Sequence, residues 1–169
     1  TERVPSQSAA VTPAEAVVCD ELATGLPHDL YAHQATALEL LATDENVVIT
    51  TSTSSGKTLI YQLQMARNYL ADEASTALCL YPTKALTSDQ EQALNDTFRL
   101  ELDFDVTVGV YDGDTKPERK RRLRENANTI LTNPAGLNVY LPRHNKDRGW
   151  HRFYNNLELV VIDEAHEYS

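Results

Sequence analysis

Short apolar runs alternate with longer amphipathic or charged stretches through most of the chain. The apolar runs predict buried strands at about 47–51, 77–81, 106–111, 129–132 and 157–162. The stretches around them predict helices at about 33–42, 57–71, 84–97 and 117–126, and another from Pro134 onward. Because strands that alternate with helices form βαβ units, this pattern predicts an α/β fold with a mainly parallel sheet and helices on both faces.

The first 25 residues follow a different pattern, which predicts a leader and a short helix. The first eleven are rich in Ser, Ala, Gln and Pro and predict a frayed leader. Thr12 supplies a capping residue, Pro13 occupies the first helical position, and Glu15 stands at the capping-box position. These signals predict a short helix that extends to about Ala23.

The composition limits the class of protein. At 169 residues, 41% of them hydrophobic, the chain is long enough for one domain with a buried core. A net charge of −10 argues against a generic nucleic-acid binder, which should be basic on at least one face. Acidic residues are spread along the chain and only five cationic residues are lysines, which fits the salty cytoplasm of a halophilic organism.

Neither a targeting segment nor the two cysteines indicate a function. No apolar run approaches the length of a membrane span and no signal-peptide pattern is present, so we expect a cytoplasmic protein. Cys79 lies in an apolar run, where a small buried thiol is the expected role. Neither Cys79 nor Cys19 is assigned to zinc or to a disulfide.

The segment 51–58, Thr-Ser-Thr-Ser-Ser-Gly-Lys-Thr, has the spacing of a phosphate-binding loop. In such a loop, backbone N–H groups cradle the phosphates, Lys57 reaches the β- and γ-phosphates, and the Thr58 hydroxyl ligates Mg²⁺. Thr51 stands where the usual pattern has its first glycine, so an ordinary helix start is the alternative. The candidate nucleotide-binding residues of this loop are Thr53, Ser54, Ser55, Gly56, Lys57 and Thr58.

The last apolar run leads directly into a pair of adjacent carboxylates, Asp163 and Glu164. In a nucleotide-hydrolysing site, Asp163 would bind Mg²⁺ and Glu164 would orient or deprotonate the attacking water. Taken alone, the pair has the alternative interpretation of a solvated strand end. Together with Lys57, the two carboxylates are the candidate catalytic residues.

Several segments resemble the motifs of superfamily 2 helicases of the DEAD/DEAH-box type, in the same order. They are Leu-Tyr-Ala-His-Gln at 30–34 for the glutamine motif, Tyr-Pro-Thr-Lys-Ala-Leu at 81–86 for motif Ia, Leu-Thr-Asn-Pro at 131–134 for motif Ib, and Asp-Glu-Ala-His at 163–166 for the DEAH box. A narrower resemblance, carried by 110–115 and 150–168, is to the branch that contains the bacterial mitomycin-repair helicase and its fungal RecQ-like counterpart. Members of that branch are 3′-to-5′ DNA helicases.

The resemblance implies a RecA-like P-loop NTPase fold for the helicase ATP-binding domain over 26–169, with ATP and Mg²⁺ as cofactors. It also implies that Gln34 reads the adenine edge through its amide and that His166 couples nucleotide state to neighbouring motifs. The implied partner is single-stranded or tailed duplex DNA, with RNA left open, bound through hydroxyl, amide and helix N-terminal N–H groups. The candidate nucleic-acid residues are Pro82, Thr83, Lys84, Thr132, Asn133 and Pro134.

Two other polar groups of residues carry no assigned chemistry. Asp112 and Asp114, on either side of Gly113, predict a turn rather than a metal site. The chain has one basic cluster, which is either a solvated helix face or a contact for flanking DNA. Its members are Arg119, Lys120, Arg121, Arg122 and Arg124.

The chain ends three residues after His166, before any motif III and before the second RecA-like domain that the resemblance implies. We therefore expect an N-terminal fragment that is inactive by itself, with a sheet whose loop strand and DEAH strand lack the strand between them. The expected activity of the complete protein is ATP-dependent unwinding of DNA in repair. Two alternatives are a double-strand DNA translocase or remodeller and a non-catalytic nucleotide- or nucleic-acid-binding remnant.

Overall fold

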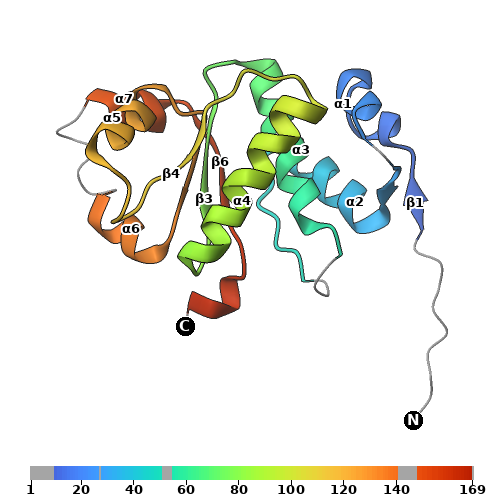
Figure 1. Cartoon of the computed structure of the whole chain (residues 1–169). Helices are drawn as coiled ribbons and strands as arrows, with labels where there is room; N and C mark the ends of the chain where they lie inside the picture. The colour runs from blue at the N-terminus through green and yellow to red at the C-terminus, as the bar shows by residue number, and fades with distance from the viewer. Residues whose placement is uncertain (1–9, 27, 51–54, 141–147, 169) are drawn as a thin grey trace, which may run out of the picture. The chain divides into compact units, whose positions relative to one another are not determined.

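The computed structural model describes residues 10–26, 28–50, 55–140 and 148–168. The chain divides into two compact units, an N-terminal unit (Thr1–Gln64) and a C-terminal unit (Met65–Ser169) (Figure 1). The division expected from the sequence, between 1–25 and 26–169, stays a prediction. None of the helices in the described ranges has the length and apolar character needed to cross a membrane.

The N-terminal unit contains short elements around a small apolar core. Leu22, Leu30 and Leu38 are fully buried there, and Ile60 is nearly so. The elements are β1 (Val11–Thr12), the 3₁₀ turn η1 (Ala14–Ala16), α1 (Asp20–Thr24), β2 (Leu30–Tyr31), α2 (Ala32–Leu41) and the first turns of α3 (Lys57–Ala71). β1 and β2 pair antiparallel, which fixes the start of α2 next to the chain's first described residues.

The single helix predicted from Pro13 to about Ala23 is wrong. The structure has instead the 3₁₀ turn η1 followed by α1, with Cys19 in an extended conformation between them. Val17 and Val18 lie at the interruption, and β-branched residues lose side-chain freedom in a helix. Burial of Val18, which is 5% exposed, outweighs the capping signals that favour a continuous helix.

The strand predicted at 47–51 is also wrong for its described part. Residues 47–50 form neither helix nor strand, and Val48 is 89% exposed; Thr51 lies outside the described residues. An apolar run forms a strand only where a neighbouring strand pairs its backbone N–H and C=O groups. Within the described residues, no strand lies beside 47–50.

The C-terminal unit has a parallel four-stranded sheet in the order β4-β5-β3-β6, which confirms the predicted α/β class. Its strands are β3 (Thr76–Leu80), β4 (Val108–Val110), β5 (Thr129–Thr132) and β6 (Leu157–Ile162). Its helical elements are the end of α3, α4 (Lys84–Asp96), the π-helical turn η2 (Thr97–Glu101), α5 (Pro117–Asn126), α6 (Pro134–Tyr140), α7 (Arg148–Asn155) and the 3₁₀ turn η4 (Ala165–Tyr168). The bounds of β5 and β6 are those predicted from the sequence.

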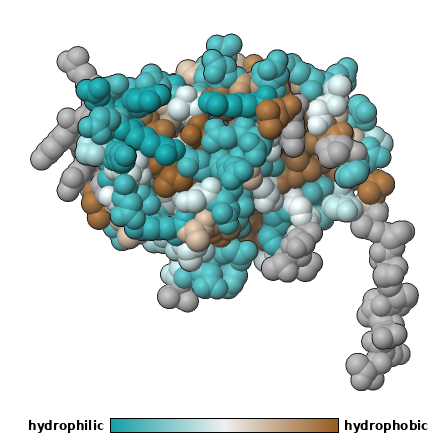
Figure 2. All heavy atoms as spheres, viewed as in Figure 1, coloured by the Kyte–Doolittle hydropathy of each residue, from teal (hydrophilic) through white to brown (hydrophobic). Residues whose placement is uncertain are grey.

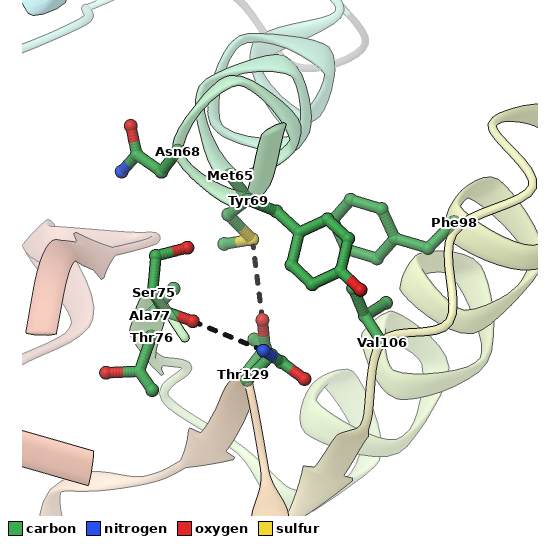
Figure 3. A pocket seen from close by; sticks show the side chains of 10 residues that line it. Met65, Asn68, Tyr69, Ser75, Thr76, Ala77, Phe98, Val106 and Thr129 are labelled. Carbon is green, nitrogen blue, oxygen red and sulfur yellow. Dashed lines mark hydrogen bonds between the residues drawn. The ribbon is translucent and has the colours of Figure 1, made fainter. Parts of the chain in front are cut away.

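Helices cover both faces of this sheet. On one face, Leu123 of α5 and the aromatic residues Trp150 and Phe153 of α7 pack against Leu78 and Ile130 of the central strands. On the other face, the end of α3 and η2 lie over β3 and β5 (Figure 3). There the Thr129 hydroxyl lies 3.9 Å from the sulfur of Met65.

A cavity of about 20 Å³ remains under Tyr69, Phe98 and Val106 on that second face (Figure 3). This volume is enough for a single water molecule. Thr76 and Thr129, which line the cavity, begin β3 and β5, so the cavity lies at the amino ends of the strands. Ligands of open α/β sheets bind at the opposite, carboxyl ends. The cavity therefore lies away from the edge at which a ligand is expected.

Helix α7 was not predicted from the sequence. Trp150, Phe153 and Tyr154 follow the i, i+3, i+4 spacing of one helix face, and their rings pack at centroid distances of 5.4 to 5.9 Å. That spacing could have indicated a helix, but the same aromatic residues are equally compatible with an extended segment that leads into the following strand.

Strand β6 lies at one edge of the sheet within the described residues, as the resemblance implies for a DEAH strand without its second neighbour. Its residues alternate between half-buried and exposed, and Val160 and Ile162 are 50% and 56% exposed. An apolar edge strand presents unpaired backbone groups and is a site for further strand pairing.

The buried thiol of Cys79 provides a test of the central strand. Cys79 is fully buried in β3, and this burial raises the pKa of its thiol to about 12. Because the thiolate is the reacting form, we expect iodoacetamide at pH 8 to alkylate exposed Cys19 and to spare Cys79 in the native protein. Peptide mass spectrometry gives the extent at each site, with a sample in denaturant as the control for full reaction. Equal alkylation of both cysteines under native conditions would contradict a buried β3.

Candidate functional site

Gly56 ends the described part of the candidate phosphate loop, immediately before α3 begins at Lys57. Its φ of +77° lies in the left-handed region, which favours glycine. Thr53 and Ser54 lie outside the described residues, whereas Lys57 and Thr58 form the first turn of α3 and are half-buried. The predicted sequence of loop, glycine and helix is therefore present from Ser55 onward.

Gln34, near the start of α2, forms a hydrogen bond with this loop. Its side chain is 3% exposed, and its Nε2 donates to the carbonyl oxygen of Gly56 at 2.9 Å. Its Oε1 accepts from the Tyr31 backbone N–H at 2.8 Å, which completes a capping interaction at the first turn of α2. A Cβ atom at position 56 would lie 2.5 Å from Gln34 Nε2, so a larger residue there would require the Gln34 amide to move.

The role predicted for Gln34 in reading adenine stays a prediction. An amide carries two N–H donors and two acceptor lone pairs, so one of each is left after the two observed bonds. Beside Gln34, a hollow of about 650 Å³ opens between Tyr31 and Leu59, within the range of small-ligand sites.

His33 is a residue of this region to which sequence reasoning gave no role. Its Nε2 lies 3.0 Å from the carbonyl oxygen of Ser55, and its ring stacks on Tyr31 at a centroid distance of 5.9 Å. A carbonyl oxygen only accepts, so this nitrogen carries the proton. The only signal for this contact was the position of His33 next to Gln34 in the motif.

In the C-terminal unit, the candidate residues follow the carboxyl ends of all four parallel strands. Segment 81–84 follows β3, 111–115 follows β4, 133–134 follows β5 and 163–166 follows β6. Parallel strands end at the same edge of a sheet, so these four segments emerge there together. Backbone hydrogen bonds continue the ladder one residue further, from Tyr111 N to Leu131 O at 2.8 Å, from Tyr81 N to Thr132 O at 3.0 Å and from Asp163 N to Leu80 O at 3.0 Å.

The segment after β3 forms the start of α4. The Thr83 hydroxyl accepts from the Leu86 N–H at 3.3 Å and caps the helix, while Pro82 is half-buried. Exposed Lys84 forms an ion pair with the carboxylate of Asp114, and the hydrogen bond and charge of Lys84 lower the pKa of that carboxyl. Lys84, which is predicted to bind nucleic acid, therefore has an acidic partner within the chain.

The segment after β4 is a tight turn organised by Asp112. Its Oδ1 accepts from the backbone N–H groups of Asp114 and Thr115, each at 3.0 Å, and from the Thr115 hydroxyl at 2.8 Å. These bonds are typical of an Asx turn, and they give Asp112 the structural role expected from the sequence.

The segment after β5 buries its polar side chains. Thr132 and Asn133 are 5% and 9% exposed. The Thr132 hydroxyl donates to the carbonyl oxygen of Tyr111 at 2.7 Å, and Asn133 Oδ1 accepts from the Gly136 N–H at 2.9 Å, at the start of α6. These side chains shape the loop, while nucleic-acid contact through Thr132, Asn133 and half-buried Pro134 stays a prediction.

The segment after β6 carries the candidate catalytic carboxylates. Asp163 is half-buried, and its Oδ1 accepts from the Glu164 N–H at 2.9 Å. Glu164 has a φ of +48°, a left-handed conformation that is rare for a residue with a side chain and often marks a functional position. His166 lies between two acids, with Nδ1 3.4 Å from Glu164 Oε2 and Nε2 3.3 Å from Glu167 Oε1.

Residues 31–169 match the sequence model of the DEAD/DEAH box helicase family. The chain belongs to that family. It is 43% identical over 159 residues to the ATP-dependent helicase HRQ1 of Saccharomyces cerevisiae and 40% identical over 141 residues to the uncharacterized ATP-dependent helicase YprA of Bacillus subtilis. These matches cover 90% and 83% of this DEAD/DEAH-box chain, but 14% and 18% of the two relatives.

The fold is similar to that of the DUF1998 helicase MrfA in crystals with DNA and AMPPNP. The TM-score is 0.88 at 34% sequence identity, and the match covers 96% of this chain and 23% of MrfA. The likeness confirms the RecA-like fold and the narrower branch that the sequence resembles. This helicase chain therefore spans less than a quarter of the relatives it matches.

The close approach of Gly56 and Gln34 predicts a sharp glycine requirement. Gly56→Ala would place a side chain on a left-handed residue, at a cost of about 1–2 kcal/mol, and would displace the Gln34 amide. We expect the full-length protein with this change to bind Mg-ATP about five- to thirtyfold more weakly by calorimetry. Gly113→Ala is the matched control, because a Cβ atom at exposed Gly113 meets nothing within 4 Å. Equal ATP affinity in the two variants would refute the role of Gly56.

Proposed function

We propose that this chain is the nucleotide-binding part of an ATP-dependent DNA helicase, which couples ATP hydrolysis to movement along a DNA strand. One observation carries the proposal: in a chain of the DEAD/DEAH box family, Asp163 and Glu164 directly follow an edge strand, at the carboxyl end of a parallel sheet. Carboxylates at this position suit metal binding and water activation.

ATP and Mg²⁺ are the proposed cofactors, and the donor groups present fit them. Gly56 lies directly before α3, so a phosphate at this helix N-terminus would meet backbone N–H groups and the half-buried side chains of Lys57 and Thr58. Within the described ranges, no group of three or more His, Cys, Asp or Glu side chains could hold a metal by itself. Mg²⁺ suits such a chain, because it is usually held by one or two protein oxygens together with substrate phosphates and water.

Each candidate residue then has one task. Lys57 would bind the β- and γ-phosphates, and Thr58 and Asp163 would each supply an oxygen ligand to Mg²⁺. Glu164 would orient or deprotonate the attacking water. Its left-handed backbone, with a φ of +48°, gives its carboxylate a different direction from the one that an extended backbone would give. Bound Mg²⁺ supplies charge stabilisation for the transferred phosphoryl group.

DNA is the proposed polymer, and the carboxyl edge of the sheet is its proposed path. MrfA, whose fold this chain shares, has been crystallised with DNA. At this edge, exposed Thr83 and Lys84 begin α4 and offer a hydroxyl, an ammonium and helix N-terminal N–H groups to a phosphate backbone. Contacts of this kind need little net positive charge, so a net charge of −10 is compatible with them.

Substitution of Glu164 tests the proposed chemistry. In the full-length protein, Glu164→Gln keeps the shape of the side chain and removes the carboxylate, so ATP and DNA binding should persist while kcat falls about 10²- to 10⁴-fold. Glu158→Gln, on an exposed acid of β6, the strand that precedes Glu164, is the matched control and should keep the parental rate. A Glu164→Gln enzyme that unwinds a tailed duplex at the parental rate would contradict the assignment.

A further inference from the structure

Helix α5 carries a positive charge that contrasts with the rest of the chain. Six of the fifteen lysines and arginines lie within 116–126, against two of the twenty-five acidic residues. Hydrophilic side chains gather over the end of the C-terminal unit where α5 and α7 pack together (Figure 2). On an acidic protein, the positive charge of α5 must be explained either by contacts within the fold or by an external anion.

Three of these cations have a structural role. Arg119 forms an ion pair with Glu91, which also accepts from the Val110 backbone N–H. The Lys120 ammonium lies 5.6 Å from the centroid of the Tyr111 ring, and Arg124 Nη1 donates to the Tyr111 hydroxyl at 2.8 Å. Together with buried Leu123, these contacts fix α5 against the end of β4.

Arg121 and Arg122 take no part in this packing. Both are exposed, and among the described residues the side chain of neither arginine forms a hydrogen bond or an ion pair. Glu118 and Glu125 stand four positions from Arg122 and Arg121, a spacing that permits ion pairs on a helix, yet the structure has none there.

The charge pattern also opposes helix stability. Arg119 and Arg122 are three positions apart, and Lys120 and Arg124 four, so each pair places like charges next to one another on the helix surface. Cations in the first turns also meet the positive end of the helix dipole. Since the side chains of Arg121 and Arg122 form no ion pair or hydrogen bond among the described residues, their charge fits an external anion. Arginine suits phosphate because its planar group donates two parallel hydrogen bonds.

We propose that α5 binds the phosphate backbone of duplex DNA through Arg121 and Arg122, next to the single-strand path along the sheet edge. The proposal rests on the proposed DNA helicase function and adds a duplex contact to it. Helix α5 starts after β4, at the carboxyl edge, and ends before β5, so it runs away from that edge. With a rise of about 1.5 Å per residue, Arg121 and Arg122 lie roughly 8–9 Å along the helix from Lys116.

The position of the two arginines favours duplex over single-stranded DNA. A single strand that follows segments 82–84 and 132–134 stays at the edge and leaves Arg121 and Arg122 without phosphates. A duplex carries one charge per about 1.7 Å of its axis, twice the density of one strand, and is stiff over a persistence length of about 150 base pairs. It therefore presents a dense phosphate surface beyond the edge.

The salt dependence of DNA binding tests this surface. In the full-length protein, the double substitution Arg121→Gln and Arg122→Gln should weaken binding to a fluorescent tailed duplex. It should also make the slope of log K against log[KCl] shallower by about 1.8, because each phosphate contact contributes about 0.9. Affinity for the single-stranded tail alone and ATPase activity stimulated by that tail should stay at the parental level. Arg99→Gln, at an exposed arginine of η2, is the matched control and should leave the slope unchanged.

The outcomes separate this proposal from the one on which it rests. A double variant with the parental slope for the tailed duplex would overturn the α5 surface, as would an equal loss of affinity for the single-stranded tail. A parental protein without DNA-stimulated ATPase activity would instead overturn the proposed function. In that case, duplex binding that still depends on Arg121 and Arg122 would support α5 as a duplex-binding helix. Equal melting temperatures of variant and parent exclude misfolding as the cause.

Discussion

Parallel pairing of four strands fixes where the candidate functional segments of the C-terminal unit begin. β3 pairs with β5 on one side and with β6 on the other, so the carboxyl ends of all three align with that of β4. Four loops far apart in the sequence therefore begin at one edge, and the backbone bond from Asp163 to Leu80 ties the acidic segment to the central strand. A loss of register in β3 would move all of these loops at once.

Polar side chains of these loops first serve the loops themselves. The Asp112 carboxylate, the Thr132 hydroxyl and the Asn133 amide each satisfy backbone groups nearby, and Gln34 does the same for Gly56 in the N-terminal unit. Side chains held in this way make a rigid frame, which lowers the cost of ordering when a ligand binds. Residues that resemble binding motifs thus act partly as positioning residues.

The sequence was sufficient for elements whose local pattern agrees with their tertiary surroundings. The bounds of β5 and β6 were predicted because each apolar run pairs along its length with the central strand β3. The prediction failed at 47–50, where an apolar run has no neighbouring strand in the described structure, and at Val18, where burial overrides capping signals. In the candidate site, the motifs named Gln34 and Glu164, whose roles stay predictions. Contacts between segments, such as that of Gln34 with Gly56, depend on tertiary packing that no local pattern encodes.

The central claim is that the segments at this edge of the sheet belong to an ATPase whose activity is stimulated by a nucleic-acid strand. The most direct measurement is the steady-state rate of ATP hydrolysis by the full-length protein as a single-stranded oligonucleotide is added. The account predicts slow hydrolysis without DNA and a saturable increase with it, because the strand binds at the edge that carries Asp163 and Glu164. Hydrolysis that is absent, or that proceeds at the same rate at every DNA concentration, would contradict the account.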